Sequence, residues 1–267
     1  MGADLEGLLL LDAVSSELQA FLCYLLCDVI PQCLGTGLHA QRFYIMAQFQ
    51  IAELARRGTV KRVPGATSQH PAYRIGPEFN FRINTRSAYA TGLPEQFTFE
   101  AVFRMDGNTL SKNWNIWQMQ DLNGNEQLAV RLNGPALSLE FSYITVENRP
   151  MTALFPYLPL LFNSRWHKML LVVRKSSVSL VLDCISVDSQ QLPARGTVNL
   201  DGFTHIGKLK DNPAVPVPFE LQSMLIHCDT AAPQRDTCGD LPASSSAASS
   251  PCPPTRLLPL QLCHEYA

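Results

Sequence analysis

Four cationic side chains stand within seven residues of each other, at Arg56, Arg57, Lys61 and Arg62. Arginine can pair with two oxygens of a sulfate at once, and lysine adds a compact point charge. The stretch 42–86 holds eight basic residues against two glutamates, a net charge of +6 in a chain whose total is −2. This pattern predicts a surface that binds an anionic polymer, and the alternative is an ordinary solvated loop. The acidic total charge and the lack of aromatic residues among these cations argue against nucleic acid.

The cysteines are gathered towards the two ends of the chain. None lies between Cys33 and Cys184, where most of the strand patterns fall. Such clustering favours disulfides that pin the ends of a secreted domain, and the alternative is free, buried cysteines in a cytosolic protein. The eight are Cys23, Cys27, Cys33, Cys184, Cys228, Cys238, Cys252 and Cys263.

No arrangement of side chains predicts catalysis. The sequence has no G-x-S-x-G, H-E-x-x-H, Walker or dinucleotide motif. His227, Cys228 and Asp229 are adjacent, but neighbours on a strand face opposite sides and cannot form a triad alone. For the same reason Trp166 and His167 face opposite sides, and we expect a core tryptophan beside a surface histidine. We therefore predict no catalytic residue, no bound cofactor and no enzyme activity.

The elements that position these residues are mostly strands. Hydrophobic residues make up 46% of the chain and charged residues 16%, enough for a sizeable core. Apolar and polar residues alternate with period two, as half-buried strands require. Asn123-Gly124 and Asn133-Gly134 each predict a hairpin turn, because Asn-Gly adopts positive φ easily. The predicted strands are 97–104, 116–120, 127–132, 137–143, 169–174, 178–183 and 219–227.

Many short strands and almost no helix predict an all-β fold, an antiparallel sandwich of two sheets. Only residues 47–57 have a helical pattern. We expect a folded domain at 41–242, a leader at 1–40 that is either a degenerate signal segment or an unusual start, and a disordered tail at 243–267. No apolar run near the start approaches the roughly 20 residues that span a bilayer, so no membrane contact is predicted.

Several motifs occur in one order along the chain. Gly92-Leu93-Pro94-Glu95 precedes the first long strand, and Trp166-His167-Lys168 opens a strand followed by Leu182-Asp183-Cys184. Later come Asp201-Gly202-Phe203 and Ile226-His227-Cys228-Asp229. Together they resemble the thrombospondin-N-terminal-like, or laminin-G-like, domain of fibril-associated collagens, most closely that of the type IX α1 chain. The resemblance covers about residues 45–242.

This resemblance implies a laminin-G or concanavalin-like jelly roll with two disulfides. It implies a bond between Cys184 and Cys238, and a second bond between Cys228 and Cys33. Cys27 is the competitor of Cys33, because the start of the chain departs from the family.

The resemblance also implies what the domain could bind. Related domains bind heparin, which supports Arg56, Arg57, Lys61 and Arg62 as heparin-binding residues. Zinc-binding relatives use positions that correspond here to Asn199, Asp201 and Gly239. Only Asp201 is a suitable ligand type, so we expect no metal site.

We therefore expect a secreted module of the extracellular matrix that binds glycosaminoglycans or matrix proteins. One alternative is a truncated collagen chain with a purely structural role, since no Gly-X-Y run is present. The other is a lectin-like domain with a calcium site, for which the only oxygen-rich candidates are Asp201, Asp211 and Asn212.

Overall fold

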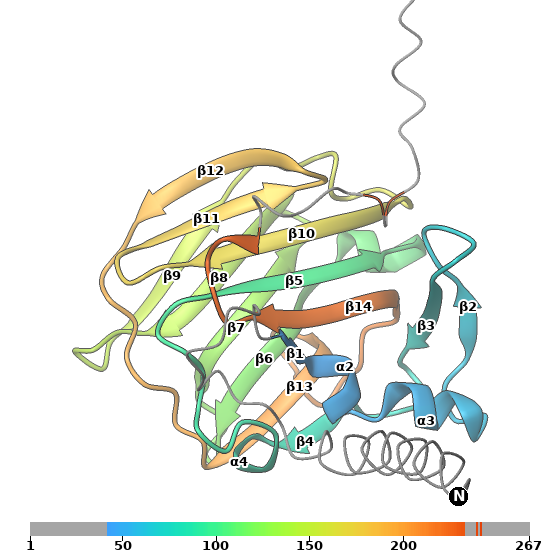
Figure 1. Cartoon of the computed structure of the whole chain (residues 1–267), viewed down its shortest axis with the longest axis horizontal. Coiled ribbons are helices and arrows are strands. Elements are labelled where there is room, and N and C mark those ends of the chain that lie inside the picture. The colour runs from blue at the N-terminus through green and yellow to red at the C-terminus, as the bar shows by residue number, and fades with distance from the viewer. Residues whose placement is uncertain (1–41, 233–238, 240, 242–267) are drawn as a thin grey trace, which may run out of the picture.

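The structure is a computed structural model that describes residues 42–232, 239 and 241. Two antiparallel sheets pack face to face, and in Figure 1 the eight-stranded sheet lies in front of the six-stranded sheet. The larger sheet contains, in order, β12 (Ile185–Gln191), β11 (Ser177–Leu182), β10 (Trp166–Val173), β5 (Phe97–Arg104), β14 (Phe219–His227), β3 (Pro71–Ile75) and β2 (Arg62–Pro64), and β1 (Arg42–Tyr44) also pairs with β14. The smaller contains β4 (Arg82–Asn84), β13 (Gly202–Leu209), β6 (Asn113–Asp121), β7 (Glu126–Asn133), β8 (Ser138–Ile144) and β9 (Pro150–Phe155).

Short helices lie at the ends of the sandwich. They are α2 (Ile45–Gln48), α3 (Ile51–Arg56), α4 (Thr85–Ala88) and the 3-10 helix η1 (Gly107–Ser111). The all-β fold is confirmed, and the segment with a helical pattern folds as α2 and α3.

The predicted meander of consecutive hairpins is present as β6, β7 and β8, and β9 extends it. Gly124 has a φ of 82° in the first predicted turn. In the second turn the positive φ of 49° falls on Leu137, not on Gly134. Gly134 is required there for a different reason, because a Cβ atom would lie 2.2 Å from the carbonyl oxygen of Leu110.

The core fills the space between the sheets. Alternate residues of β5 point inwards, and those of β6 meet them from the other sheet. Phe99 of β5 stacks on Trp117 of β6 with ring centroids 5.0 Å apart and planes 9° apart. Both side chains are fully buried, so this contact joins the two sheets directly.

The outer face of the six-stranded sheet is unusual because its polar side chains are buried. Arg131 of β7 is 6% exposed and pairs with Glu126 at 2.7 Å and with Glu140 at 2.9 Å. His205 of β13 is 7% exposed, and its register partner on β4 is Arg82. Burial lowers the pKa of His205 to about 4, and the cations Lys208 and Arg82 contribute to this lowering. His205 is therefore neutral at pH 7.

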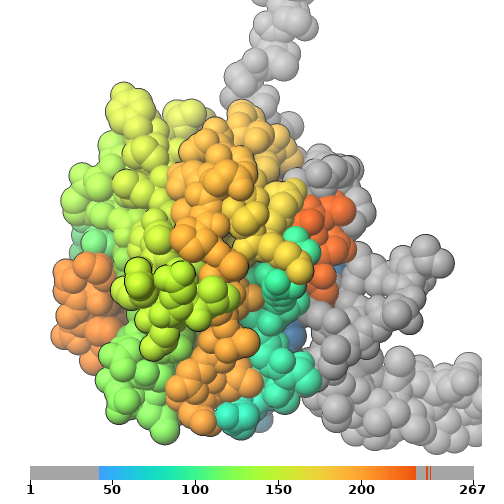
Figure 2. All heavy atoms as spheres, turned by 90° about the vertical axis from the view of Figure 1, so that its left-hand side faces the viewer, coloured from blue at the N-terminus to red at the C-terminus, as the bar shows by residue number. Residues whose placement is uncertain are grey.

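The strands at one edge of each sheet lie next to each other. Figure 2 looks at this side of the sandwich, where β12 and β9 are the edge strands. The side-chain amide of Gln190 in β12 donates to the carbonyl oxygen of Leu154 in β9 at 2.6 Å. The contact joins the two sheets at their open edge, far along the chain from the basic segment.

The remaining observations concern the two end segments of the chain and helices that could span a membrane. The predicted leader at 1–40 and tail at 243–267 lie outside the described residues. Within the part that the structure describes, no helix has the length and hydrophobicity to cross a bilayer.

Replacing Phe99 with alanine should lower the free energy of unfolding by about 3–5 kcal/mol, because it leaves a cavity against Trp117. Urea denaturation followed by tryptophan fluorescence measures this change. Tyr157→Ala is the control, since Tyr157 is 82% exposed and its loss should change stability by about 0.5 kcal/mol or less. Equal effects of the two substitutions would show that the stacked pair is not central to the core.

Stability should also fall in mild acid because of His205. The unfolded chain takes up a proton near pH 6.5, whereas folded His205 takes it up only near pH 4. Unfolding thus becomes easier as the pH falls from 7 to 5, by about 1–2 kcal/mol from this residue. His205→Gln removes that contribution, so the stability difference between wild type and variant should change over this pH range. A difference that stays constant from pH 7 to pH 5 would contradict the prediction.

Candidate functional site

The basic segment is built where a short helix turns into an edge strand. Ile51 of α3 is buried and anchors the helix on the core, and Val60 anchors the chain again after the turn. Gly58 ends the helix with a φ of 78°, a conformation that glycine adopts without strain. The cations between and after these two anchors therefore remain at the surface, at the right of Figure 1.

Two of the four predicted cations share one carboxylate. Glu53 forms an ion pair with Arg56 one turn on, and another with Arg57 at 2.7 Å. Both arginines are well exposed, with 79% and 68% of their side-chain surface accessible. Glu53 offsets part of their charge, so this pair attracts an anion less strongly than the sequence alone predicts.

The other two cations have no carboxylate to pair with among the described residues. Lys61 and Arg62 are exposed, and neither forms an ion pair within residues 42–232. Successive residues at the start of a strand point to opposite sides, so the two side chains diverge. All four predicted residues are exposed, and Lys61 and Arg62 carry the charge that no described carboxylate compensates.

A surface pocket lies beside this segment. Its volume is about 450 Å³, and its lining residues are Gly58, Thr59, Lys61, Val63, Arg74, Glu78 and Glu220. Arg74 Nη1 lies 3.4 Å from both Asp106 and Glu220, longer than a strong charge-assisted hydrogen bond. Glu220 has a closer partner in Arg104, whose Nε lies 2.7 Å away. Arg74 is therefore held only loosely by acidic neighbours.

Two further arginines of the positively charged stretch do not join this surface. β4, which precedes Arg86 and contains Arg82, belongs to the six-stranded sheet and β2 to the eight-stranded sheet, so these two strands are not neighbours. Arg82 stacks over the ring of Phe203, with its guanidinium carbon 3.3 Å from the ring centre. Arg86 donates to Asp201 from Nε at 3.0 Å and from Nη2 at 2.7 Å.

The positions that correspond to the zinc ligands of related domains are engaged in other contacts or have no side chain to offer. Asp201 is occupied by Arg86, and the side chain of Asn199 accepts a hydrogen bond from the amide of Asp201 at 2.9 Å. Gly239 offers no side chain. Among residues 42–232, 239 and 241, no three His, Cys, Asp or Glu side chains form a group that could hold a metal.

The loop proposed for calcium is likewise engaged in local contacts. Asn212 accepts a hydrogen bond from the amide of Ala214 at 3.2 Å, and Asp211 lies 3.5 Å from Lys210. Asp201 precedes β13 and Asp211 follows it, so the two carboxylates stand at opposite ends of this strand.

The cysteine predictions fall partly outside the described residues. Cys184 follows β11 with a φ of 64°, and Cys228 follows the end of β14. Their predicted partners Cys238 and Cys33, and the alternative Cys27, lie outside the described residues. Both disulfide pairings stay predictions.

The expectation for Trp166 and His167 is wrong. Trp166 is half-buried on the outer face of its sheet, with the guanidinium of Arg104 5.4 Å from its ring. His167 is the buried residue, at 3% exposed, and its Nδ1 lies 2.8 Å from Asp183. The strand alternates as predicted, but the polar ring faces inwards because Asp183 and Asn163 satisfy its two nitrogens.

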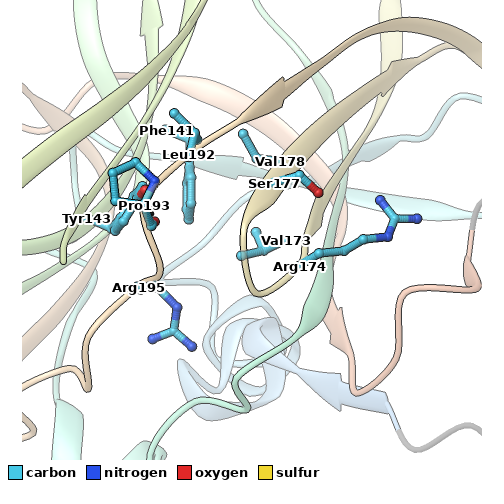
Figure 3. A pocket seen from close by; sticks show the side chains of 9 residues that line it. All are labelled: Phe141, Tyr143, Val173, Arg174, Ser177, Val178, Leu192, Pro193 and Arg195. Carbon is cyan, nitrogen blue, oxygen red and sulfur yellow. Dashed lines mark hydrogen bonds between the residues drawn. The ribbon is translucent and has the colours of Figure 1, made fainter. Parts of the chain in front are cut away.

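A second hollow lies at the far end of the sheets, and Figure 3 shows its lining. Side chains from β8, β10 and the loop after β12 converge there, but the volume is only about 10 Å³. That is close to the space of a single water molecule. Tyr143 donates from its hydroxyl to the carbonyl oxygen of Pro193 at 2.6 Å, which closes this end. The lining residues are Phe141, Tyr143, Val173, Arg174, Ser177, Val178, Leu192, Pro193 and Arg195.

Two residues of the site, Glu53 and Arg74, were not predicted from the sequence. Glu53 precedes Arg56 and Arg57 by three and four positions, the spacing of ion pairs on a helix, so its role could have been predicted. Arg74 gave no such signal. It reaches the pocket only because β3 pairs with β2, and neither strand was predicted.

Comparisons of the sequence with known proteins find collagen chains as relatives. No family model matches the chain. It is 29% identical over 187 residues to the collagen alpha-1(XXI) chain of Xenopus laevis, covering 69% of this chain and 19% of that one. It is 33% identical over 171 residues to the human collagen alpha-1(XVI) chain, covering 64% of this chain and 10% of that one. It is 26% identical over 176 residues to the human collagen alpha-1(XIX) chain, covering 65% of this chain and 15% of that one. The chain thus spans between a tenth and a fifth of these relatives' lengths.

A solved structure is similar in fold alone. The ligand-binding domain of botulinum neurotoxin serotype D, solved in complex with N-acetylneuraminic acid, superposes with a TM-score of 0.50 at 10% identity. The match covers 74% of this chain and 45% of that one. It supports the jelly-roll sandwich.

The broader resemblance to fibril-associated collagens is confirmed, whereas the particular closeness to type IX stays a prediction. The relatives are collagen chains and not enzymes. By sequence, the chain is homologous to the non-collagenous domains of fibril-associated collagens.

Proposed function

We propose that this chain is a secreted module of the extracellular matrix that binds heparin and related sulfated glycosaminoglycans through the surface of α3 and β2. The observation that carries the proposal is the group of four exposed cations, two of which have no carboxylate partner among the described residues. The homology to collagen chains supports the location in the matrix.

The charges of this surface suit a long polymer better than a short ligand. Each exposed ion pair contributes about 0.2–1 kcal/mol, so four pairs contribute roughly 1–4 kcal/mol. Repeated weak contacts of this size add up along a polymer by multivalency. Salt screens them, because the Debye length shortens to about 8 Å at physiological ionic strength. Matrix proteins are the second class of partner, consistent with the collagen homologues.

Changing Arg56, Arg57, Lys61 and Arg62 together to alanine should make the chain leave a heparin column at lower salt. The double change of Lys61 and Arg62 should account for more than half of that shift, because Glu53 already offsets the charge of the two other residues.

The matched control removes four exposed cations elsewhere, by changing Arg149, Arg165, Lys175 and Lys210 to alanine. It has the same net charge as the first variant and should elute close to wild type. Elution of both fourfold variants at one salt concentration would show that only net charge matters and would overturn the proposed surface.

Secretion into an oxidising compartment would allow the disulfide between Cys184 and Cys238 that the family resemblance implies. Peptide mapping of the secreted chain without reductant should recover the two cysteines linked. Recovery of Cys238 as an alkylated free thiol would rule the pairing out.

A further inference from the structure

The pocket beside the basic segment places two cations across a pair of strands. The amide of Arg74 donates to the carbonyl oxygen of Lys61 at 2.9 Å, which fixes the two residues opposite each other just before β2 begins. Both line the same pocket of about 450 Å³. Like charges at opposite positions destabilise a strand pair, and an anion between them would relieve the repulsion.

Donors are available in this pocket. The ammonium of Lys61 has no hydrogen-bond or ion-pair partner among the described residues. Arg74 uses only Nη1 towards Asp106 and Glu220, so its Nε and Nη2 have no partner in the described part of the chain. A guanidinium edge of this kind matches the two oxygens of a carboxylate.

The acidic residues of the pocket set the rest of its chemistry. Glu220 is held by Arg104, so it adds little free negative charge. Glu78 is exposed and forms no ion pair in the described residues, which leaves its oxygens able to accept hydrogen bonds from hydroxyl groups. A ligand that fits therefore combines one carboxylate with several hydroxyls in a volume suited to a sugar ring.

We propose that this pocket holds a uronate residue of the bound glycosaminoglycan, with its carboxylate between Lys61 and Arg74 and a ring hydroxyl at Glu78. The inference rests on the proposed function but adds to it. The exposed cations attract sulfates anywhere along the polymer, whereas the pocket selects for the carboxylate.

Calorimetric titration of the full chain with two heparin hexasaccharides tests the pocket. One is native, and in the other the carboxylates are reduced to hydroxymethyl groups while the sulfates are kept. Wild type should bind the native form about fivefold more tightly. Lys61→Met should abolish this preference, and so should Thr59→Phe, which narrows the pocket without changing any charge.

Arg62→Met is the matched control, because Arg62 is the next residue along the chain but does not line the pocket. It should weaken binding of both hexasaccharides and keep their ratio. The pocket assignment is overturned if wild type binds both forms equally, if it binds neither, or if Lys61→Met keeps the preference. The salt concentration of elution from heparin measures the contribution of the sulfates, whereas the ratio of the two hexasaccharide affinities measures that of the carboxylate. The proposed surface and the proposed pocket can therefore be contradicted independently.

Discussion

The stacked contact between Phe99 and Trp117 is the interaction on which the rest of the sandwich depends. It brings the inner faces of β5 and β6 together at the centre of the core. Strand alternation then fixes which residues of each sheet face outwards. The same alternation leaves Lys61 and Arg62 on opposite sides of one short edge segment, so the core indirectly decides which cation lines the pocket.

Much of this fold could be predicted where the two faces of a strand differ. β5, β6, β7 and β8 show the alternation clearly, because one face is the apolar core. β12 was missed because six of its seven residues are exposed, which leaves no apolar period to detect. β2 and β4 were missed because each has only three residues, and their strand conformation comes from pairing with β3 and β13.

The site was predictable as a set of charges but not as an arrangement of partners. A run of cations is visible in any sequence, and Glu53 lies within helical reach of two of them. The partners of Arg74 and Arg86 lie far along the chain, at Glu220 and Asp201, and only tertiary structure brings them together. The burial of His167 was not predicted for the same reason, since it depends on Asp183 from the turn after the neighbouring strand β11.

The hydrogen bond from Gln190 to the carbonyl oxygen of Leu154 affects whether a strand of another molecule can pair with this edge of the sandwich. An unpaired strand edge is a template on which a strand of another chain can add, and exposed apolar side chains such as Leu154 and Ile185 would favour that addition. Here one edge carbonyl of β9 is already occupied by a side chain of β12. That part of the β9 edge is therefore closed to a strand of another molecule, and the side chain that closes it comes from the other sheet of the same sandwich.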